Sequence, residues 1–273
     1  MSISAQDCCI LNEGNGSWAF EPLAQKLSSS LGVEIATTPR AFNYLLHVED
    51  IIQPFAFPTF ISVNSVNLAS DKRSLARVFS ENGVPTPKTE LLDSFSEVLE
   101  FVQNHSESEW CLKFPTSCGG HGHRLVTNES SAPANWPKPF VVQKFIRLER
   151  PQVFRTFCAG NKIFGWIVRL YPEGTEETPW VAHARGARYA NLCDPPEEAC
   201  AAARKALVAT GLLDSFGCVD LIQDLDGSWL VLEVGTDGLF NHVDRDVGDE
   251  KFEQEMQQRI TKAFWNSADK HEN

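Results

Sequence analysis

The alternation of hydrophobic and polar residues is clearest over residues 216–240, FGCVDLIQDLDGSWLVLEVGTDGLF, and it predicts a β-hairpin. Two apolar runs, CVDLIQ and SWLVLEV, flank the turn DLDG, whose Asp-Gly pair is a strong two-residue turn signal. A two-residue loop places Asp220 directly opposite Glu233, and a four-residue loop still keeps both carboxylates on one face. The other face is apolar and is predicted to be buried through Val219, Leu221, Leu230, Leu232 and Val234.

Asp220 and Glu233 carry like charges, and like charges that face one another across a hairpin destabilise it. A hard divalent cation between the two carboxylates is the simplest compensation. The alternative is a solvated hairpin face with two ordinary acids, and the hairpin alone does not decide between these readings.

The other periodic segments predict strands and helices of an α/β protein. Strands are predicted at residues 8–11, 33–37, 43–48, 60–63, 110–114, 140–146, 153–159 and 162–169. Helices are predicted at residues 20–31, 70–82, 93–104, 195–210 and 252–265. Ser70 is expected to cap the second of these helices, and Gly83 ends it.

Composition indicates an ordinary globular protein with a strongly acidic balance. The 273 residues are 42% hydrophobic and 22% charged, with a formal net charge of −12. This charge argues against nucleic acid or an anionic membrane as a partner, although local lysines and backbone amides can still bind ATP. No apolar run approaches the ~20 residues of a membrane span, and no signal peptide is visible. The eight cysteines form no CxxC pair, so reduced thiols and a cytoplasmic location are expected.

A glycine-rich loop, PTSCGGHGH, follows the predicted strand that contains Lys113. It holds Gly119, Gly120 and Gly122, and glycines let backbone N–H groups approach an anion closely. A flexible hairpin turn is the alternative. Lys72 lies in the first turn of its helix, where the helix dipole disfavours a cation, and this indicates a function for its side chain.

Three further segments carry weaker signals. EGNGS resembles a phosphate-binding loop only loosely, and Trp18 beside it is expected to be a packed aromatic residue. Arg155 and Arg169 interrupt otherwise apolar strands. The segment WVAHARGARYAN contains Arg185 and Arg188, which either cradle a carboxylate or phosphoryl group or are solvated.

Taken in order, these segments resemble the ATP-grasp superfamily, and most of all its branch of ribosomal-protein glutamate ligases and lysine-biosynthesis ligases. The resemblance covers roughly two thirds of the chain. The Asp-Lys helix of the family corresponds to Asp71-Lys72 and the segment GVPTP, and its strand lysine corresponds to Lys113. The glycine-rich flap corresponds to SCGGHG, the adenine-binding hinge to QKFI, and the metal hairpin to GCVD and EVG. Three arginines of the family correspond to Arg155, Arg169 and Arg185.

The resemblance implies an ATP-grasp fold of the α/β (α+β) class with a short N-terminal α/β domain. The implied divisions are residues 1–68, a central subdomain with the flap at 69–141, and a C-terminal subdomain with the metal hairpin at 142–273. The implied cofactors are ATP and Mg²⁺, or Mn²⁺ in its place. The implied nucleotide contacts are Lys72, Lys113, Ser117, Gly119, Gly120, Gly122, Gln143, Lys144, Phe145, Ile146, Glu149 and Arg155.

The chain departs from the family pattern at three places. Lys144 stands where the family has an acidic residue in the hinge. Val153 stands where the family has an acidic residue shortly before the strand arginine, and Glu149 is expected to make the contact of that acid instead. Gly235 stands where the family has its third metal ligand, an Asn. The implied metal ligands are therefore Asp220, Glu233 and, as a replacement, Asp237.

The implied function is ATP-dependent joining of a carboxylate to an amine, through an acyl phosphate, on a small molecule or peptide. Arg169 and Arg185 are implied to hold the acyl phosphate. The alternatives are another phosphoryl transfer, by a kinase or an intramolecular cyclising synthetase, and a non-catalytic nucleotide-binding module. The expected partners are ATP, the carboxylate and an amino-acid-like amine, with no nucleic acid and no membrane. A homodimer is also expected, because relatives are often dimers or tetramers.

Overall fold

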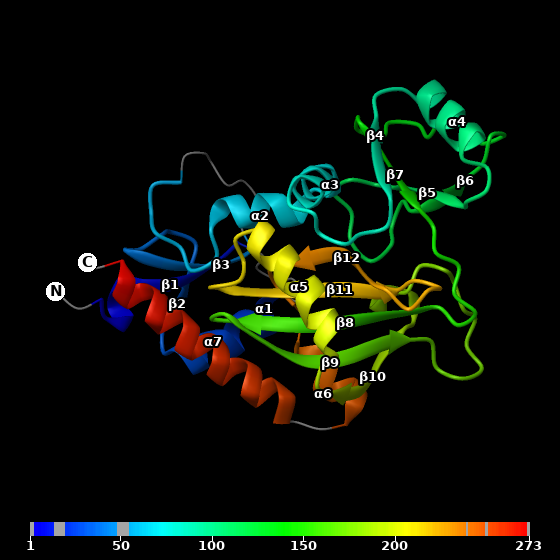
Figure 1. The fold of residues 1–273 in the computed structure, drawn as a ribbon. Helices are drawn as coiled ribbons and strands as arrows, with labels where there is room; N and C mark the ends of the chain where they lie inside the picture. The colour runs from blue at the N-terminus through cyan, green and yellow to red at the C-terminus, as the bar shows by residue number, and fades with distance from the viewer. Residues whose placement is uncertain (1–2, 14–19, 48–54, 239, 249–250, 272–273) are drawn as a thin grey trace.

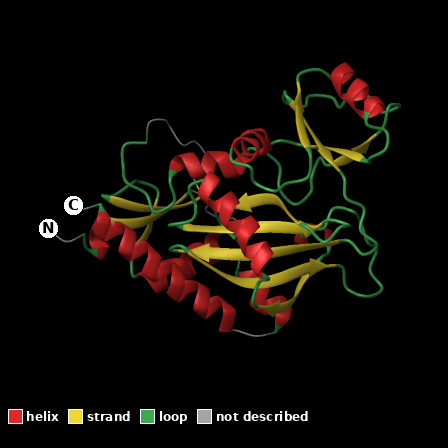
Figure 2. Ribbon diagram, viewed as in Figure 1, coloured by secondary structure: helices red, strands yellow, loops and turns green. Residues whose placement is uncertain are grey.

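The computed structural model contains three β-sheets, which lie in consecutive stretches of the chain with helices on their faces (Figures 1 and 2). It describes residues 3–13, 20–47, 55–238, 240–248 and 251–271. The predicted α/β (α+β) class is confirmed by this mixture of sheets and helices. Trp18 and the EGNGS loop beyond Glu13 lie outside the described residues.

The first sheet is parallel and has the strand order β2-β1-β3. A short 3₁₀ helix, η1, precedes it, and helix α1 packs on it because Leu23, Leu27 and Leu31 recur at helical spacing and are buried. The elements are η1 (Ala5–Asp7), β1 (Cys8–Asn12), α1 (Phe20–Leu31), β2 (Glu34–Ala36) and β3 (Phe42–His47). The predicted strand–helix–strand order is confirmed for these residues.

The predicted strand at residues 60–63 is wrong, because helix α2 (Val63–Ser70) begins there. Ser62 caps this helix, and its Oγ accepts a hydrogen bond from the Ser65 N–H at 3.0 Å. The β-branched and polar composition of VNSVNLAS hides the helix from a pattern search, although the serine cap was a readable signal.

The prediction that Ser70 caps the next helix is also wrong. Helix α3 (Lys72–Glu81) has Asp71 as its N-cap, and Asp71 Oδ1 accepts a hydrogen bond from the Arg73 N–H at 2.8 Å. Asp71 is extended, so it separates α2 from α3 and places Lys72 at the first helical position. The position of Lys72 at a helix start is therefore as predicted.

The second sheet is antiparallel, with the order β4-β7-β5-β6, and has a small core of its own. Val98 of helix α4, Leu112 and Val142 are fully buried in this core. The elements are β4 (Thr89–Leu92), α4 (Phe95–Asn104), β5 (Trp110–Lys113), β6 (Arg124–Val126) and β7 (Phe140–Lys144).

The third sheet is antiparallel, with the order β10-β9-β8-β11-β12, and carries the largest core. Its strands are β8 (Gln152–Ala159), β9 (Lys162–Leu170), β10 (Arg188–Cys193), β11 (Phe216–Gln223) and β12 (Trp229–Gly235). The associated helices are η2 (His183–Arg185), α5 (Glu197–Ala209), α6 (Asn241–Val247) and α7 (Lys251–Lys270).

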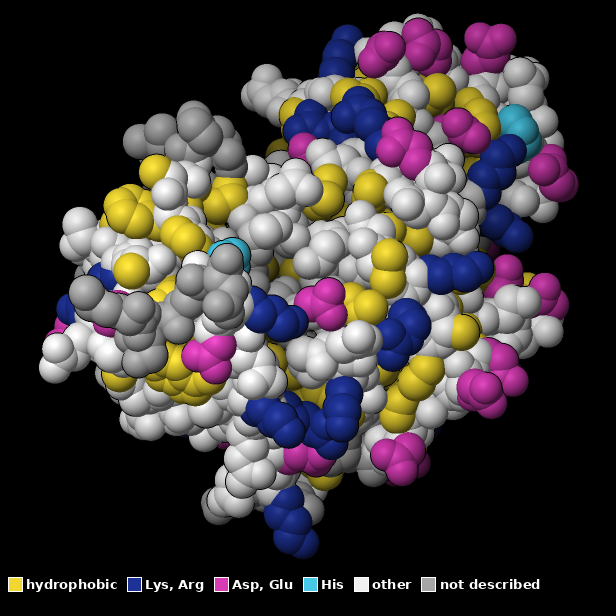
Figure 3. Space-filling view, turned by 60° about the vertical axis from the view of Figure 1, so that its left-hand side comes forward, with side chains coloured by type: hydrophobic (Ala, Val, Ile, Leu, Met, Phe, Trp, Pro, Cys, Tyr) yellow, Lys and Arg dark blue, Asp and Glu magenta, His cyan; other side chains and the backbone are white. Residues whose placement is uncertain are grey.

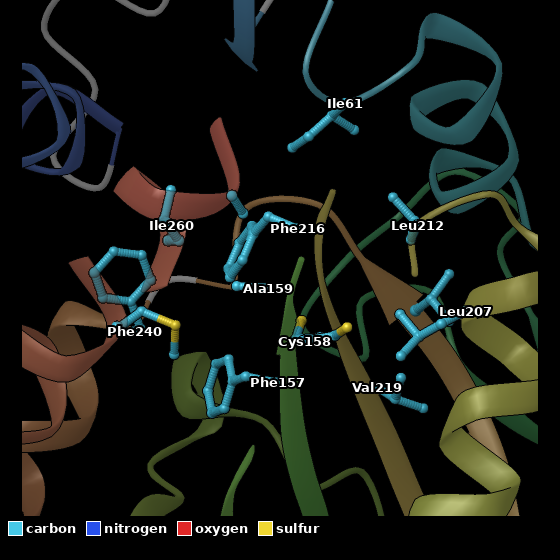
Figure 4. Packing of buried hydrophobic residues seen from close by; sticks show 14 of the residues in the cluster. Ile61, Phe157, Cys158, Ala159, Leu207, Leu212, Phe216, Val219, Phe240 and Ile260 are labelled. Atoms are coloured by element: carbon cyan, nitrogen blue, oxygen red, sulfur yellow. The ribbon is translucent and has the colours of Figure 1, made fainter. Parts of the chain in front are cut away.

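Different helices bury the two faces of this third sheet. Cys158 and Val219 point toward Leu207 of α5, as Figure 4 shows. Phe157 lies on the other face, where its ring centroid is 5.2 Å from that of Phe252 in α7. Because side chains alternate along a strand, the face that holds Phe157 also carries Arg155, beyond the end of the apolar core.

The hairpin of β11 and β12 confirms the predicted pairing of Asp220 with Glu233, for a reason that the sequence does not show. The tip is a three-residue loop, since the Asp224 N–H donates to the Ser228 carbonyl at 2.8 Å. This loop alone would shift the register by one residue. A β-bulge at Leu232 restores it.

The bulge also changes which leucines of the hairpin are buried. Leu221 pairs with Val231, which is fully buried, whereas Leu230 and Leu232 are half-buried. The prediction that Leu230 and Leu232 belong to the buried face is therefore wrong. Leu232 instead faces a cavity that lies against the second sheet.

The surface mixes charges of both signs on the face shown in Figure 3, where Lys and Arg lie among Asp and Glu. No described helix is long and apolar enough to cross a membrane. Because charges of both signs are mixed on this face, an excess of one charge inside a cavity is local to that cavity and is not part of a larger charged patch here.

Candidate active site

A cavity of about 700 Å³ lies between the second and third sheets, and its size is typical of a site for a small ligand. Most of the predicted site residues line it. From helix α3, the second sheet, the flap and the hinge these are Lys72, Lys113, Ser117, Gly119, Gly120, Gln143, Lys144, Phe145 and Ile146. From the following segment and the third sheet they are Glu149, Arg169, Asp220 and Glu233. The lining does not include Gly122, Arg155, Arg185 or Asp237.

Two ammonium groups meet at one end of the cavity. Lys72 Nζ donates a hydrogen bond to the Ser117 carbonyl at 2.5 Å and lies 4.0 Å from Glu233 Oε2. Lys113 is the last residue of β5, and burial lowers the pKa of its ammonium below the ordinary value. An anion that enters the cavity would stabilise the charged ammonium of Lys113.

The glycine-rich flap needs its glycines for conformation and for space. Gly119, Gly120 and Gly122 all have positive φ, between 63° and 72°. A Cβ at Gly122 would lie 2.8 Å from Phe114 Cβ, which is closer than real contacts allow. The flap is therefore a defined turn packed on the end of β5, which argues against the alternative of a merely flexible hairpin turn.

Gly122→Ala is expected to raise the KM for ATP by roughly tenfold, because the substitution adds both backbone strain and a clash, together about 1–2 kcal/mol. Gly174→Ala is the matched control, since Gly174 also has positive φ (78°) but a Cβ there meets nothing within 4 Å. Steady-state kinetics of the two variants checks this. Equal KM values would show that flap geometry does not matter for nucleotide binding.

Arg185 contacts the flap from the other side of the cavity. Its Nη2 donates to the Gly120 carbonyl at 3.0 Å, and its Nε lies 3.4 Å from the Gly119 carbonyl. Sequence reasoning places Arg185 on an acyl phosphate. The structure places it on the flap backbone, outside the cavity lining.

Trp180 is a cavity residue that sequence reasoning missed. Its ring centroid lies 5.4 Å from Phe145 of the hinge and 5.7 Å from His123 of the flap. Burial lowers the pKa of His123 to about 3, so this ring is neutral at physiological pH. An aromatic residue at the start of the arginine-rich segment was the only readable signal.

Asp220 is buried and forms ion pairs with two arginines. Arg155 binds it with both arms, Nε to Oδ1 at 2.6 Å and Nη2 to Oδ2 at 2.9 Å, and Arg169 Nη2 also donates to Oδ2. Burial acts to raise the pKa of Asp220, but the two guanidinium charges outweigh it and lower the pKa to about 2. The carboxylate is therefore ionised throughout the physiological range.

The two arginines differ in whether their guanidinium groups can still interact with a ligand. Arg155 Nη1 donates to Tyr189 Oη at 3.2 Å and to the Gly238 carbonyl at 3.0 Å, which turns it away from the predicted nucleotide contact. Arg169 lines the cavity, and its buried Nε has no hydrogen-bond partner among the described residues. The Arg169 side chain, which lines the cavity, would attract an anionic ligand there.

Asp237 is near enough to Asp220 and Glu233 for the charges of the three carboxylates to interact. It is absent from the cavity lining, and burial raises the pKa of its carboxyl group. Within the described residues, no three His, Cys, Asp or Glu side chains are close enough to hold a metal ion together. A Cβ at Gly235 would meet Cys218 Sγ at 3.0 Å, so a larger side chain fits poorly where the family has its Asn.

The hinge uses part of its backbone within the protein. The Lys144 N–H donates to the Lys88 carbonyl and the Phe145 N–H to the Glu109 carbonyl, both at 2.8 Å. The N–H of Ile146, a residue that lines the cavity, has no acceptor among the described residues. This leaves Ile146 as the hinge donor for a ligand.

Comparison with known proteins agrees with this arrangement. A family profile described as the ATP-grasp domain matches residues 69–235. The chain is 28% identical over 206 residues to a tetrahydromethanopterin:alpha-L-glutamate ligase of Methanocaldococcus jannaschii, a match that covers 71% of this chain and 64% of the relative. The chain thus spans less than two thirds of that relative's length.

Solved structures with the same fold cover nearly the whole chain. The ATP-grasp ligase PsnB in complex with a minimal precursor has a TM-score of 0.68 at 12% identity, covering 97% of this chain and 100% of its own. The D-cycloserine synthetase DcsG has a TM-score of 0.67 at 17% identity, covering 96% and 99%. D-alanine–D-alanine ligase from Bacillus anthracis has a TM-score of 0.65 at 13% identity, covering 99% and 100%. The chain belongs to the ATP-grasp family.

Proposed function

We propose that this protein uses ATP to join a carboxylate to an amine and releases ADP and phosphate. The observation that carries the proposal is the charge of the cavity and its wall. The charged residues that line the cavity are five cations and four carboxylates, a small excess of cations in a chain whose net charge is −12: Lys72, Lys113, Lys144, Arg147 and Arg169 against Glu149, Glu177, Asp220 and Glu233. A local excess of this kind fits a polyphosphate.

The proposed nucleotide position follows from the two ends of the cavity. The apolar end, with Ile146 and Leu232, would take the adenine, and the Ile146 N–H would donate to the base. The cationic end, with Lys72 and Lys113, would take the phosphates. The Gly-rich flap would cover them with its backbone N–H groups.

The carboxylates of Asp220 and Glu233 fit a magnesium ion in donor type, because oxygen ligands are those that this ion prefers. Magnesium is commonly held by one or two carboxylates with phosphate oxygens completing its shell, so two protein ligands suffice. When bound, the ion would neutralise charge on the β- and γ-phosphates. Asp237 as a third ligand stays a prediction, and so do manganese, a homodimer and a cytoplasmic location.

In the proposed reaction, an oxygen of the substrate carboxylate attacks the γ-phosphorus, and the bond to the leaving ADP oxygen breaks. The amine then attacks the carbonyl carbon of the acyl phosphate, loses a proton, and expels phosphate. The guanidinium of Arg169, which lines the cavity, would donate to the transferred group. Positioning and electrostatics supply this chemistry, and no protein nucleophile is needed.

The substrates are proposed at the level of class: a small molecule or peptide that bears the carboxylate, and an amino-acid-like amine. The relatives named above include a glutamate ligase and a ligase bound to a precursor peptide. They support both possibilities without choosing between them.

We expect ADP to form over many turnovers only when Mg²⁺, ATP, a carboxylate and an amine are all present, which a coupled assay over a panel of both substrates measures. Mass spectrometry of the product separates an amide from a phosphorylated or cyclised product. Asp237→Asn tests the predicted third ligand, and an unchanged Mg²⁺ titration in this variant would leave the site with Asp220 and Glu233 as its protein ligands. A weaker Mg²⁺ response would identify Asp237 as a ligand. Tight ATP binding without ADP from any pair would favour the non-catalytic module.

A further inference from the structure

Asp246 of α6 is a buried carboxylate that no step of the proposed reaction uses. Its side chain is 4% exposed, and its Oδ2 accepts a hydrogen bond from the Tyr189 N–H at 3.2 Å. The same oxygen lies 3.1 Å from His183 Nε2, which donates to it when the ring proton is on Nε2, and Arg245 Nη2 lies 3.0 Å from the same nitrogen. Arg245 pairs with the other oxygen from the solvent side, with its own side chain 58% exposed. Asp246 thus links α6 to β10 and to the start of η2.

His183 opens a tight turn whose other end is Arg185. The Arg185 N–H donates to the Ala182 carbonyl at 2.9 Å, and the Ala187 N–H donates to the same carbonyl at 3.2 Å. Gly186 closes the turn with φ of 97°, a conformation that favours glycine. The turn is therefore stiff, and fixing His183 also fixes the direction of Arg185.

The path continues from Arg185 onto the flap, as the hydrogen bonds to the Gly119 and Gly120 carbonyls show. Behind the turn, the ring of His242 stacks on the ring of His183, with the two centroids 4.9 Å apart. His242 is only 7% exposed. The ring of His183 therefore has one packed face and two charged partners, Asp246 and Arg245. A continuous set of contacts runs from α6 to the flap.

We propose that Asp246 is a positioning residue that acts through His183 and η2 to hold Arg185 on the glycine-rich flap. The flap would then close more or less tightly over its ligand according to how firmly α6 anchors the turn. The consequence for nucleotide affinity rests on the proposed function. The hold on the flap does not, because it is present in the protein without any ligand.

Asp246→Asn is the direct test, because asparagine keeps the shape but removes the charge: its neutral oxygen binds the Tyr189 and His183 donors more weakly, and its NH₂ group faces Arg245. Hydrogen exchange of peptides spanning residues 117–123 is measured in the nucleotide-free protein. We expect exchange in the flap to become about tenfold faster, which is the change expected from one lost hydrogen bond to a charged group. Glu255→Gln is the matched control and should leave flap exchange unchanged, because it breaks an ion pair with Arg259 on α7 whose carboxylate side chain is 50% exposed, and exposed ion pairs contribute little.

A double mutant separates positioning from general loosening. Arg185→Gln should also speed flap exchange, and adding Asp246→Asn to it should produce no further change. His183→Leu should reproduce the effect of Asp246→Asn if that variant fails to fold. Additive effects in the double mutant, or unchanged flap exchange in Asp246→Asn and His183→Leu, would overturn the proposal.

Kinetics provides a second readout in the active protein. We expect Asp246→Asn to raise the KM for ATP several-fold while kcat changes less, because the reacting groups are untouched. An equal fall in kcat with unchanged KM would contradict the proposed role. If no substrate pair yields ADP, the ligase proposal fails, and the exchange experiment still decides the role of Asp246.

Discussion

Replacing Asp220 with asparagine is expected to lower the rate of ADP formation by about 10³-fold. The substitution removes the charge that would hold the metal ion, and it also releases the two arginines that the carboxylate orients. Arg155 and Arg169 each donate to Asp220, so both would lose their partner at once. The loss should appear in kcat under saturating ATP and Mg²⁺.

The same variant should also be less stable, by about 3–5 kcal/mol in the free energy of unfolding, because two buried guanidinium groups remain without their counter-charge. The contribution of the ionised Asp220 carboxylate to stability should be visible in how the free energy of unfolding depends on pH. The folded pKa of Asp220, about 2, is below the unfolded value of about 3.9, so its contribution is complete above pH ~4 and is lost as pH falls toward 2. Urea unfolding at several acidic pH values should therefore show a weaker acid-induced loss in the variant.

Glu233→Gln is the matched comparison, since Glu233 faces Asp220 but its side chain is 43% exposed. It should lose activity while its free energy of unfolding stays within about 0.5 kcal/mol of the wild type. Full activity in both variants would remove the hairpin carboxylates from the proposed mechanism. Full activity in Glu233→Gln alone would leave Asp220 as the essential acid.

Lys113→Met is expected to weaken ATP binding by about 10- to 100-fold, because it removes a charge-assisted contact to phosphate. The same substitution should raise the stability of the folded protein. Burial lowers the pKa of Lys113, which means that the folded protein disfavours the charged ammonium, and methionine avoids this cost. Calorimetric titration with ATP and thermal unfolding measure the two effects.

Lys88→Met is the control for this result. Lys88 precedes β4 of the same sheet, but it is exposed and does not line the cavity. It should change neither ATP affinity nor stability appreciably. If Lys113→Met binds ATP as the wild type does, or is clearly less stable, the assignment of Lys113 to the phosphates is wrong.

Local sequence signals were enough to find the elements of the site. Lys113 before a glycine-rich loop, and two acids in register across a hairpin, depend on strand alternation and turn chemistry, which act over a few residues. The α/β class followed from periodicity alone. These features could be predicted because each is determined close to where it is read.

Contacts between distant segments could not be predicted in this way. The position of Arg185 on the flap joins residues about 65 apart, and the attachment of Arg155 to Asp220 spans the same separation. Asp237 is adjacent in sequence to the metal hairpin, yet the turn at Gly238, held by Arg155, leaves it outside the cavity lining. Which partner a charged side chain chooses depends on packing between sheets, and no local pattern encodes it.

The bulge at Leu232 has a consequence for how relatives of this chain can diverge. The three-residue tip and the bulge cancel one another, so that Asp220 and Glu233 stay in register. Without the bulge, the same tip would place Asp220 opposite Leu232 and turn Glu233 to the other face. A two-residue tip in a chain of the same length would need no bulge, because Leu225 would then face Ser228 and Asp220 would face Glu233 directly. A change of tip conformation and the loss of the bulge should therefore be inherited together, while substitutions that alter neither remain free.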